Sequence, residues 1–271
     1  MNRLFFYPKV DLSKVSSPNP YVNNMEEALS AHFSIVNRQY NKGGVIEFFK
    51  YLKSTDSYLF NWIEDLPIYR YGKMQVVFFV LFLKIAKLMD KRIIWILHNK
   101  YSHFAQKNFW TDLMYRLLVK NSDLILTHSN AGIEFVSMEY GDFLSHKVKY
   151  FPHPIEQKIE VAESDKKSYD LLIWGALHPY KGVVDFLEVM WREFEIGKRP
   201  RVLIVGKCFD KEYLERLNEK LSDGVVHIDE FKSLEEIAKY ASTSKFVFFP
   251  YNSPSLLSSG TLMDSLRMGT K

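Results

Sequence analysis

The sequence predicts an α/β protein built from two doubly wound domains that face each other across a cleft. Short apolar runs rich in β-branched and aromatic residues alternate with segments of helical spacing along most of the 271 residues. This alternation stops at Pro152-His153-Pro154 and starts again at Tyr169. A chain of this length is also longer than most domains with a single hydrophobic core and is sufficient for two domains. Ligands of such sheets bind at the carboxyl ends of the strands, where we expect the functional site.

The first domain is expected to cover residues 1–154. Its apolar runs predict strands, and the segments between them have the apolar spacing of helices. Asn23 and Asn24, followed by Glu26 and Glu27, mark the start of the first helix. The expected strands are 3–7, 57–62, 92–97, 123–127 and 148–151. The expected helices are 21–33, 45–53, 71–90, 108–120 and 131–140.

Residues 155–168 are charged and weakly apolar, and we interpret them as a linker to a second domain at 169–271. Its expected strands are 169–174, 201–206, 224–228 and 245–249. Its expected helices are 181–196, 209–222, 233–242 and one from about residue 259. Gly269 comes just after this last helix, where an α/β domain would normally run into another strand. We therefore expect the second domain to be incomplete.

Charge and cysteine content limit the function. The formal net charge is +4 and the isoelectric point about 8.8, which suits an anionic ligand or an anionic membrane surface. This excess is too small to predict nucleic-acid binding. The single cysteine, Cys208, excludes an intrachain disulfide framework and a cysteine-rich metal site, and it favours a reducing compartment. We expect a cytoplasmic protein, with membrane association on the cytoplasmic face left open.

The region 71–90 has two interpretations. Lys73, Lys84, Lys87 and the adjacent Lys91 surround several large apolar residues of this region. Its most apolar part is too short to span a bilayer. It is either a crossover helix buried against a sheet, or a helix that rests on an anionic membrane.

Two strand ends in the second domain predict a phosphate site. The strand 169–174 runs into a loop that begins at Gly175 and ends at Lys181, and the last strand runs into Ser259-Gly260-Thr261. A helix that opens after a strand presents unpaired N–H groups and a positive dipole end, which suit a phosphate. Lys181 can neutralise diphosphate charge there. Asp264, one turn into the helix, can stabilise the dipole or accept a hydrogen bond from a hydroxyl.

His98 and Asn99 directly follow the strand 92–97 in the first domain, at the edge where ligands bind. A histidine there can exchange a proton with a reacting hydroxyl near neutral pH. His103, His128 and His153 also flank strand ends. Their spacing matches no zinc site, so we expect no metal. Signatures of P-loop and dinucleotide-binding proteins are absent.

An ordered set of motifs resembles bacterial family 4 glycosyltransferases, which have the GT-B architecture of two Rossmann-like domains. The motifs are RIIWILHN at 92–99, DLILTHS at 123–129, PHP at 152–154, G-x-L-x-P-Y-K-G at 175–182 and the Pro-Tyr…Ser-Gly…Gly pattern at 249–269.

The resemblance implies a retaining, metal-independent hexosyl-type transferase without cofactors. It would move a sugar from a nucleotide-diphosphate donor to a saccharide or lipid-linked acceptor in surface polysaccharide synthesis. It implies that His98 and Lys181 are catalytic and that Asn99 and His103 lie on the acceptor side. It assigns the donor to Gly175, Lys181, Ser259, Gly260, Thr261 and Asp264.

Three alternatives stay open. Ala176 and Leu256 depart from the family pattern, where an arginine and a glutamate are usual, and this favours a catalytically inactive homologue that binds a donor or partner. Another GT-B enzyme acting on nucleotide sugars, such as an epimerase, would need carboxylates near the sugar. A basic scaffold on a membrane surface would bind lipid through 71–91 without nucleotide affinity.

Overall fold

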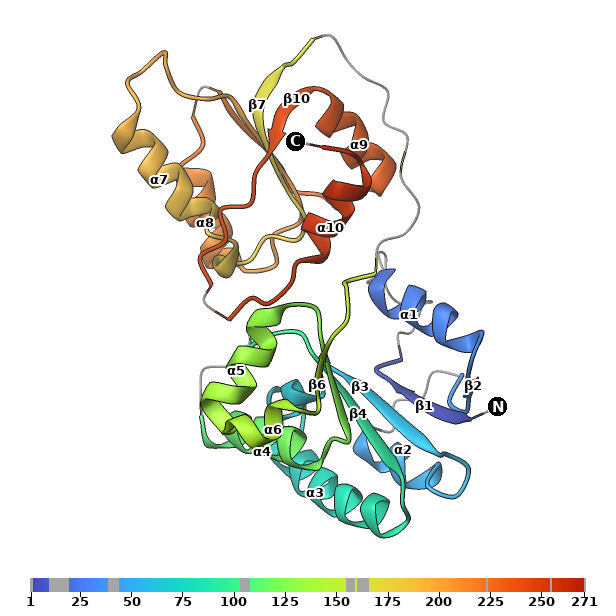
Figure 1. The fold of residues 1–271 in the computed structure, drawn as a ribbon. Coiled ribbons are helices and arrows are strands. Elements are labelled where there is room, and N and C mark those ends of the chain that lie inside the picture. The colour runs from blue at the N-terminus through green and yellow to red at the C-terminus, as the bar shows by residue number, and fades with distance from the viewer. Residues whose placement is uncertain are drawn as a thin grey trace. The chain divides into compact units, whose positions relative to one another are not determined.

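The computed structural model describes residues 2–9, 20–38, 44–102, 108–154, 159, 166–222, 224–253 and 255–270. It consists of two compact units, labelled by element in Figure 1. Unit 1 is Met1–Pro154 with Ser255–Ser258, and unit 2 is Ile155–Pro254 with Ser259–Lys271.

Unit 1 has a six-stranded sheet in the order β2-β1-β3-β4-β5-β6, and all its pairs are parallel. The strands are β1 (Arg3–Tyr7), β2 (Ser34–Ile35), β3 (Ser57–Asn61), β4 (Arg92–Leu97), β5 (Leu124–Thr127) and β6 (Val148–Tyr150). The helices are α1 (Pro20–Ser30), α2 (Val45–Lys50), the 3₁₀ helix η1 (Ile63–Ile68), α3 (Gly72–Leu88), α4 (Phe109–Asn121), α5 (Asn130–Tyr140) and α6 (Asp142–Ser145).

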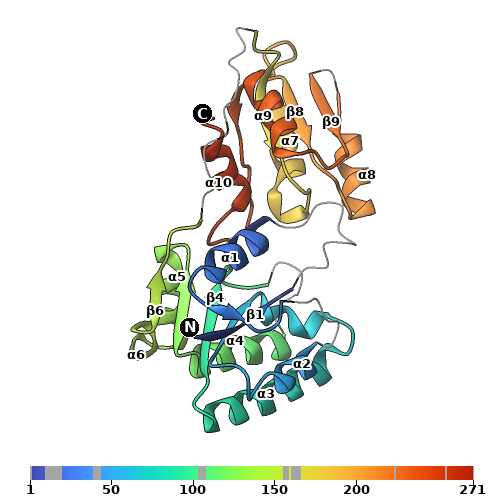
Figure 2. The same cartoon turned by 90° about the vertical axis from the view of Figure 1, so that its right-hand side faces the viewer.

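Side chains that alternate along the strands of unit 1 pack into two separate cores, one on each face of the sheet. On β1, Phe5 joins a large aromatic cluster with residues of α2, α3, α4 and α5, including Phe48 and Phe82. Leu4 and Phe6 point to the other face and pack with residues of α1. Figure 2 shows α1 on one side of this sheet and α2 and α3 on the other. The unit is therefore doubly wound, as predicted.

Unit 2 has a four-stranded parallel sheet in the order β10-β7-β8-β9. The strands are β7 (Tyr169–Trp174), β8 (Val202–Val205), β9 (Val225–Ile228) and β10 (Ser244–Val247). The helices are the 3₁₀ helix η2 (Pro179–Lys181), α7 (Val183–Glu193), α8 (Lys211–Glu219), α9 (Leu234–Ser242) and α10 (Gly260–Arg267). One face packs on α7 and α8, and the other packs on α9 and the end of α10.

The predicted helix at 181–196 begins later than expected. Lys181 ends the 3₁₀ turn η2, and α7 starts at Val183. Between them Gly182 has a φ of +66°, a left-handed conformation that interrupts the helix. A Cβ at this position would lie 2.1 Å from the carbonyl oxygen of Pro250, so only glycine fits this close approach.

One short segment within residues 169–271 packs on unit 1. Residues Ser255–Ser258 belong to unit 1. Asn99 and Leu256 form an antiparallel bridge, the Lys100 amide donates to the Ser255 carbonyl at 2.8 Å, and Leu257 joins the aromatic core of unit 1. The chain thus returns briefly to the first unit before α10 begins.

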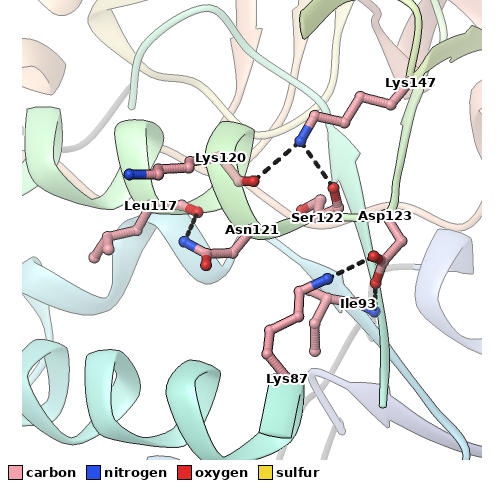
Figure 3. A network of polar contacts seen from close by, with 8 residues as sticks. All are labelled: Lys87, Ile93, Leu117, Lys120, Asn121, Ser122, Asp123 and Lys147. Carbon is pink, nitrogen blue, oxygen red and sulfur yellow. Dashed lines mark hydrogen bonds and ion pairs between the residues drawn. The ribbon is translucent and has the colours of Figure 1, made fainter. Parts of the chain in front are cut away.

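Polar contacts fix the edge of unit 1 where β5 starts (Figure 3). The Asp123 carboxylate accepts hydrogen bonds from the Lys87 ammonium at 2.5 Å and from the Ile93 amide at 2.7 Å. The Lys147 ammonium donates to the carbonyl oxygens of Lys120 and Ser122. These contacts join the ends of α3 and α4 to β4, β5 and β6.

Among the described residues, no helix combines the length and apolarity that a membrane span needs.

Candidate active site

The first candidate site lies where the order of the second sheet reverses. From β7 the chain continues to β8 on one side, whereas β10 returns to the other side of β7. In doubly wound sheets ligands bind at such a switch point, outside the carboxyl ends of the strands. Gly175 directly follows β7, and the segment after β10 contains Tyr251. We call Gly175, Lys181, Tyr251 and Thr261 the Lys181 site.

Hydrogen bonds and packing hold the two loops of this site together. The Asn252 amide donates to the Tyr180 carbonyl at 3.0 Å, and the Asn252 side chain donates to Asp185 at 3.0 Å. The close approach of Gly182 to Pro250 adds a second contact. The loop that carries Lys181 is therefore fixed against the loop that carries Tyr251.

Lys181 is only 5% exposed, so it is not a solvated surface lysine. A Cβ built on Gly175 would lie 2.8 Å from Lys181 Nζ and 3.2 Å from Thr261 Oγ1. The Lys181 ammonium and the Thr261 hydroxyl therefore both lie beside Gly175. The ammonium also lies 5.6 Å from the centre of the Tyr251 ring. Predicted residues Gly175, Lys181 and Thr261 are thus brought together.

No carboxylate among the described residues forms an ion pair with Lys181. Burial lowers the pKa of Lys181 to about 8, because the charged form loses its hydration. A buried ammonium without a counter-ion is costly to the folded protein. A bound anion would offset this cost, so the arrangement favours an anionic ligand.

The N-terminus of α10 adds donors to this site. The Ser259 hydroxyl caps the helix by accepting from the Leu262 amide at 3.2 Å, and it lies 2.9 Å from the Tyr251 hydroxyl. A Cβ at Gly260 would meet nothing within 4 Å, so space is open beside the first turn. The amides of this turn point to the positive end of the helix dipole. Asp264 lies further along and forms an ion pair with Arg267 at 3.9 Å.

The second candidate site is in unit 1, at the carboxyl ends of its central strands. We define the histidine cluster as Tyr21, Trp62, His98, His128 and His153. Ring centres of His98 and His128 are 5.4 Å apart, and those of His128 and His153 are 4.9 Å apart. Three of the histidines that flank strand ends, His98, His128 and His153, therefore lie close together. His103 lies outside the described residues.

Hydrogen bonds assign the protons in this cluster. The Asn61 amide nitrogen donates to the Tyr7 carbonyl, so its oxygen accepts from His98 Nε2 at 3.2 Å. His98 Nδ1 therefore carries a lone pair. The Phe151 carbonyl accepts from His128 Nδ1 at 2.9 Å, so His128 Nε2 accepts from the Tyr21 hydroxyl at 2.9 Å.

Aromatic packing fixes the His98 ring. The Trp62 indole stacks on it with 4.4 Å between ring centres and 17° between planes, and the Tyr21 ring meets it edge-on. Burial, reinforced by His128 and His153, holds the pKa of His98 well below 6.5. His98 is therefore a neutral, oriented imidazole at physiological pH, which suits hydrogen bonding to a hydroxyl.

Several of these residues were not predicted from the sequence. Trp62 has a left-handed backbone with φ of +50°, which is uncommon for a bulky residue and marks functional turns. Tyr21 is a helix residue with no motif around it, and only the tertiary structure brings it to His128. Tyr251 was part of a quoted motif, and its position in the loop between the last strand and Ser259-Gly260-Thr261 is the signal that could have identified it. No three His, Cys, Asp or Glu side chains in the described part of the chain are grouped as a metal site.

Neither family models nor curated protein sequences match this chain. Solved structures do. HepE from Anabaena, crystallised with UDP and glucose, is similar over 100% of this chain and 79% of its own, with 13% identity and a TM-score of 0.63. An alpha-glucosyltransferase, solved with UDP and a 13-mer DNA, has the same coverage and identity and a TM-score of 0.60. The pneumococcal O-GlcNAc transferase GtfA, solved with UDP and GlcNAc, is similar over 86% of this chain and 44% of its own, with 16% identity and a TM-score of 0.53. The chain has the GT-B fold of these glycosyltransferases, and the predicted fold class is confirmed.

Proposed function

We propose that this protein is a glycosyltransferase that moves a sugar from a nucleoside-diphosphate donor to the hydroxyl of a saccharide or lipid-linked acceptor. The bond from the anomeric carbon to the diphosphate oxygen breaks, and a bond from that carbon to the acceptor oxygen forms. The acceptor hydroxyl passes its proton to an oxygen of the leaving diphosphate, and the nucleoside diphosphate leaves with the electron pair of the broken bond. As the resemblance implies, we propose retention of the anomeric configuration, independence of metal, and a role in cytoplasmic synthesis of surface polysaccharide.

The observation that carries this proposal is the buried Lys181 ammonium, which has no carboxylate partner among the described residues and lies at the switch point of the second sheet. In the proposed reaction the donor diphosphate lies against Lys181 and the N-terminus of α10. Negative charge grows on the leaving diphosphate, and a preorganised cation and helix amides stabilise it. Thr261 would add a hydroxyl donor beside the ammonium.

The neutral His98 imidazole has a complementary role. Its Nδ1 lone pair accepts a hydrogen bond from a sugar hydroxyl, while Asn61 and Trp62 fix the ring. A neutral imidazole adds no positive charge next to an anomeric carbon that becomes positive in the transition state. The fold comparison supports this function, because the three structural neighbours described above are glycosyltransferases solved with UDP.

A release assay tests the proposed function. The protein is incubated with UDP-, GDP- and ADP-sugars, with and without saccharide acceptors, and the nucleoside diphosphate released is measured. We expect release with at least one donor. Lys181→Met should remove about 2–4 kcal/mol of transition-state stabilisation, the scale of one preorganised donor, and should lower the rate of release accordingly. Lys198→Met, which changes an exposed lysine of the same unit, is the matched control.

One observation favours a second candidate, a catalytically inactive homologue that binds a donor. Leu256, at the place of a family glutamate, lies in the segment that pairs with Asn99 of unit 1, so no carboxylate is provided there. Nucleotide binding without release from any donor would support this candidate over the enzyme. No binding of any nucleoside diphosphate would exclude both.

A further inference from the structure

The helix α3 has two apolar faces. Its inner face carries Val76, Phe79 and Phe82, which are fully buried in the core of unit 1. Its outer face is exposed to solvent over the whole length of the helix, about 25 Å for 17 residues. Both interpretations of this region made from the sequence therefore need to be considered, because burial accounts for only one face.

The outer face carries a stripe of exposed apolar residues, which is densest from Met74 to Leu81. Residues three or four positions apart share one face of a helix. Met74, Val77, Phe78 and Leu81 follow this spacing, and Leu88 lies two turns beyond Leu81 on the same side. We call these five residues the α3 stripe. Val77 is 60% exposed, and Leu88 is 85% exposed. Contiguous apolar surface of this kind marks a site of interaction.

The stripe continues into a groove at the start of α3. The groove has a volume of about 360 Å³ and includes Ile46 of α2, Tyr69 and Tyr71 before the helix, and Met74 and Phe78 of the stripe. Tyrosine side chains combine an apolar ring with a polar hydroxyl, which suits the boundary between headgroups and acyl chains.

The charges of α3 indicate which kind of partner the α3 stripe binds. The helix contains three lysines and no acidic residue. Lys87 is neutralised by Asp123 (Figure 3). Lys73 and Lys84 are exposed, and no carboxylate in the described part of the chain pairs with either. They lie on one side of the stripe by helical spacing, and Arg70 adds a cation at the mouth of the groove. The acidic residues Glu64 and Asp65 that precede the helix are buried.

We propose that the α3 stripe docks on a bilayer that contains anionic phospholipids. The apolar side chains enter the acyl boundary, the tyrosines lie at the headgroups, and Arg70, Lys73 and Lys84 contact lipid phosphates. A bilayer fits better than a protein partner, because the stripe is long and narrow and has along one side two lysines that no carboxylate of the described residues pairs with. This inference is independent of the nucleotide chemistry of unit 2.

Vesicle flotation tests the proposal with the full chain. Vesicles of phosphatidylcholine mixed with phosphatidylglycerol should carry the protein at low salt, and vesicles of phosphatidylcholine alone should carry much less. The double variant Val77→Glu/Leu81→Glu should bind at least about tenfold less. The double variant Lys73→Gln/Lys84→Gln should lose the preference for anionic vesicles and most of the salt dependence.

Met138→Glu is the matched control, because Met138 is an 83% exposed apolar residue of α5 in the same unit and lies outside the stripe. It should bind vesicles like the unchanged protein. Circular dichroism verifies that each variant is folded. The proposal is wrong if the unchanged protein does not float with anionic vesicles, or if the stripe variants float equally well. It is also wrong if Leu81→Glu abolishes a dimer in solution while vesicles are never bound.

Discussion

The Lys181 ammonium occupies space that Gly175 leaves open, since a Cβ at residue 175 would lie 2.8 Å from Lys181 Nζ. Gly175 also has a φ of +100°, which side-chain-bearing residues rarely adopt. The first glycine of the G-x-L-x-P-Y-K-G segment therefore has two physical reasons to be glycine. Both concern the same lysine loop, and both can be tested by one substitution.

Gly175→Ala should destabilise the protein by about 1–2 kcal/mol through backbone strain, with additional displacement of the ammonium. Chemical denaturation measures the first effect, and UDP titration measures the second. Gly197→Ala is a suitable control, because Gly197 also has a positive φ but its Cβ would meet nothing within 4 Å. If UDP affinity falls equally in both variants, the steric link to Lys181 is wrong.

Lys181→Met should make the ligand-free protein more stable. The substitution removes a buried charge that has no carboxylate partner among the described residues and keeps an apolar side chain of similar length. The lowered pKa of Lys181 corresponds to a gain of roughly 1–3 kcal/mol at neutral pH. Denaturant unfolding at pH 7 measures this change. A loss of stability would mean that Lys181 has a structural partner after all.

The affinity for UDP should fall as the pH rises above about 8. In the free protein the pKa of Lys181 is lowered to about 8 from an ordinary value of 10.5. A bound diphosphate favours the charged form of Lys181 and raises its pKa. Above pH 8, Lys181 must therefore take up a proton when the diphosphate binds, and the affinity falls as the pH rises. Titrations from pH 6.5 to pH 9.5 follow this decline at about tenfold per pH unit or less. Lys181→Met should remove the decline, and a decline of equal size in that variant would assign it to another group.

His98 should remain neutral through the physiological range. Burial and the neighbouring histidines hold the pKa of His98 well below 6.5. Nuclear magnetic resonance should therefore find no titration of the His98 ring between pH 8 and pH 6. Trp62→Ala opens one face of the ring to water, so it should shift the midpoint upward, towards 6.5. A midpoint near 6.5 in the unchanged protein would contradict the packing of this cluster.

Glu64→Gln should stabilise the protein at pH 8 and change little near pH 4. Glu64 is fully buried beside Asp65, and burial with the adjacent carboxylate raises its pKa well above 4.5. The folded state therefore holds a proton that the unfolded state has lost, and stability decreases as the pH rises above 4.5. Glutamine stays neutral and can still accept from the Trp95 indole, now 3.0 Å from Glu64. Unfolding curves of both proteins at several pH values measure the difference, which should grow with pH.

Sequence patterns predicted much of the fold because both sheets consist of short, continuous apolar strands. The runs at 92–97 and 169–174 coincide with β4 and β7. The two-residue strand β2 and the 3₁₀ helix η1 were not predicted. β2 is too short to show a period, and Pro67 inside η1 argues against a helix from sequence alone.

The candidate site divides in the same way. Gly175, Lys181 and Thr261 belong to local strand–loop–helix patterns, so their types and spacing predicted that they come together. Trp62 and Tyr21 reach His98 only through the tertiary packing of β3, β4 and α1. The return of Ser255–Ser258 to unit 1 depends on a bridge to Asn99, which no local pattern reveals.

A calorimetric titration of UDP, GDP and ADP, each beside its own nucleoside, into the unchanged protein and Lys181→Met tests the diphosphate site. If Lys181 and the start of α10 hold a diphosphate, at least one nucleoside diphosphate binds the unchanged protein much more tightly than its nucleoside does, and the substitution removes most of that difference. Equal affinity of the unchanged protein for every diphosphate and its nucleoside, or equal diphosphate affinity in the two proteins, would show that Lys181 does not hold a diphosphate.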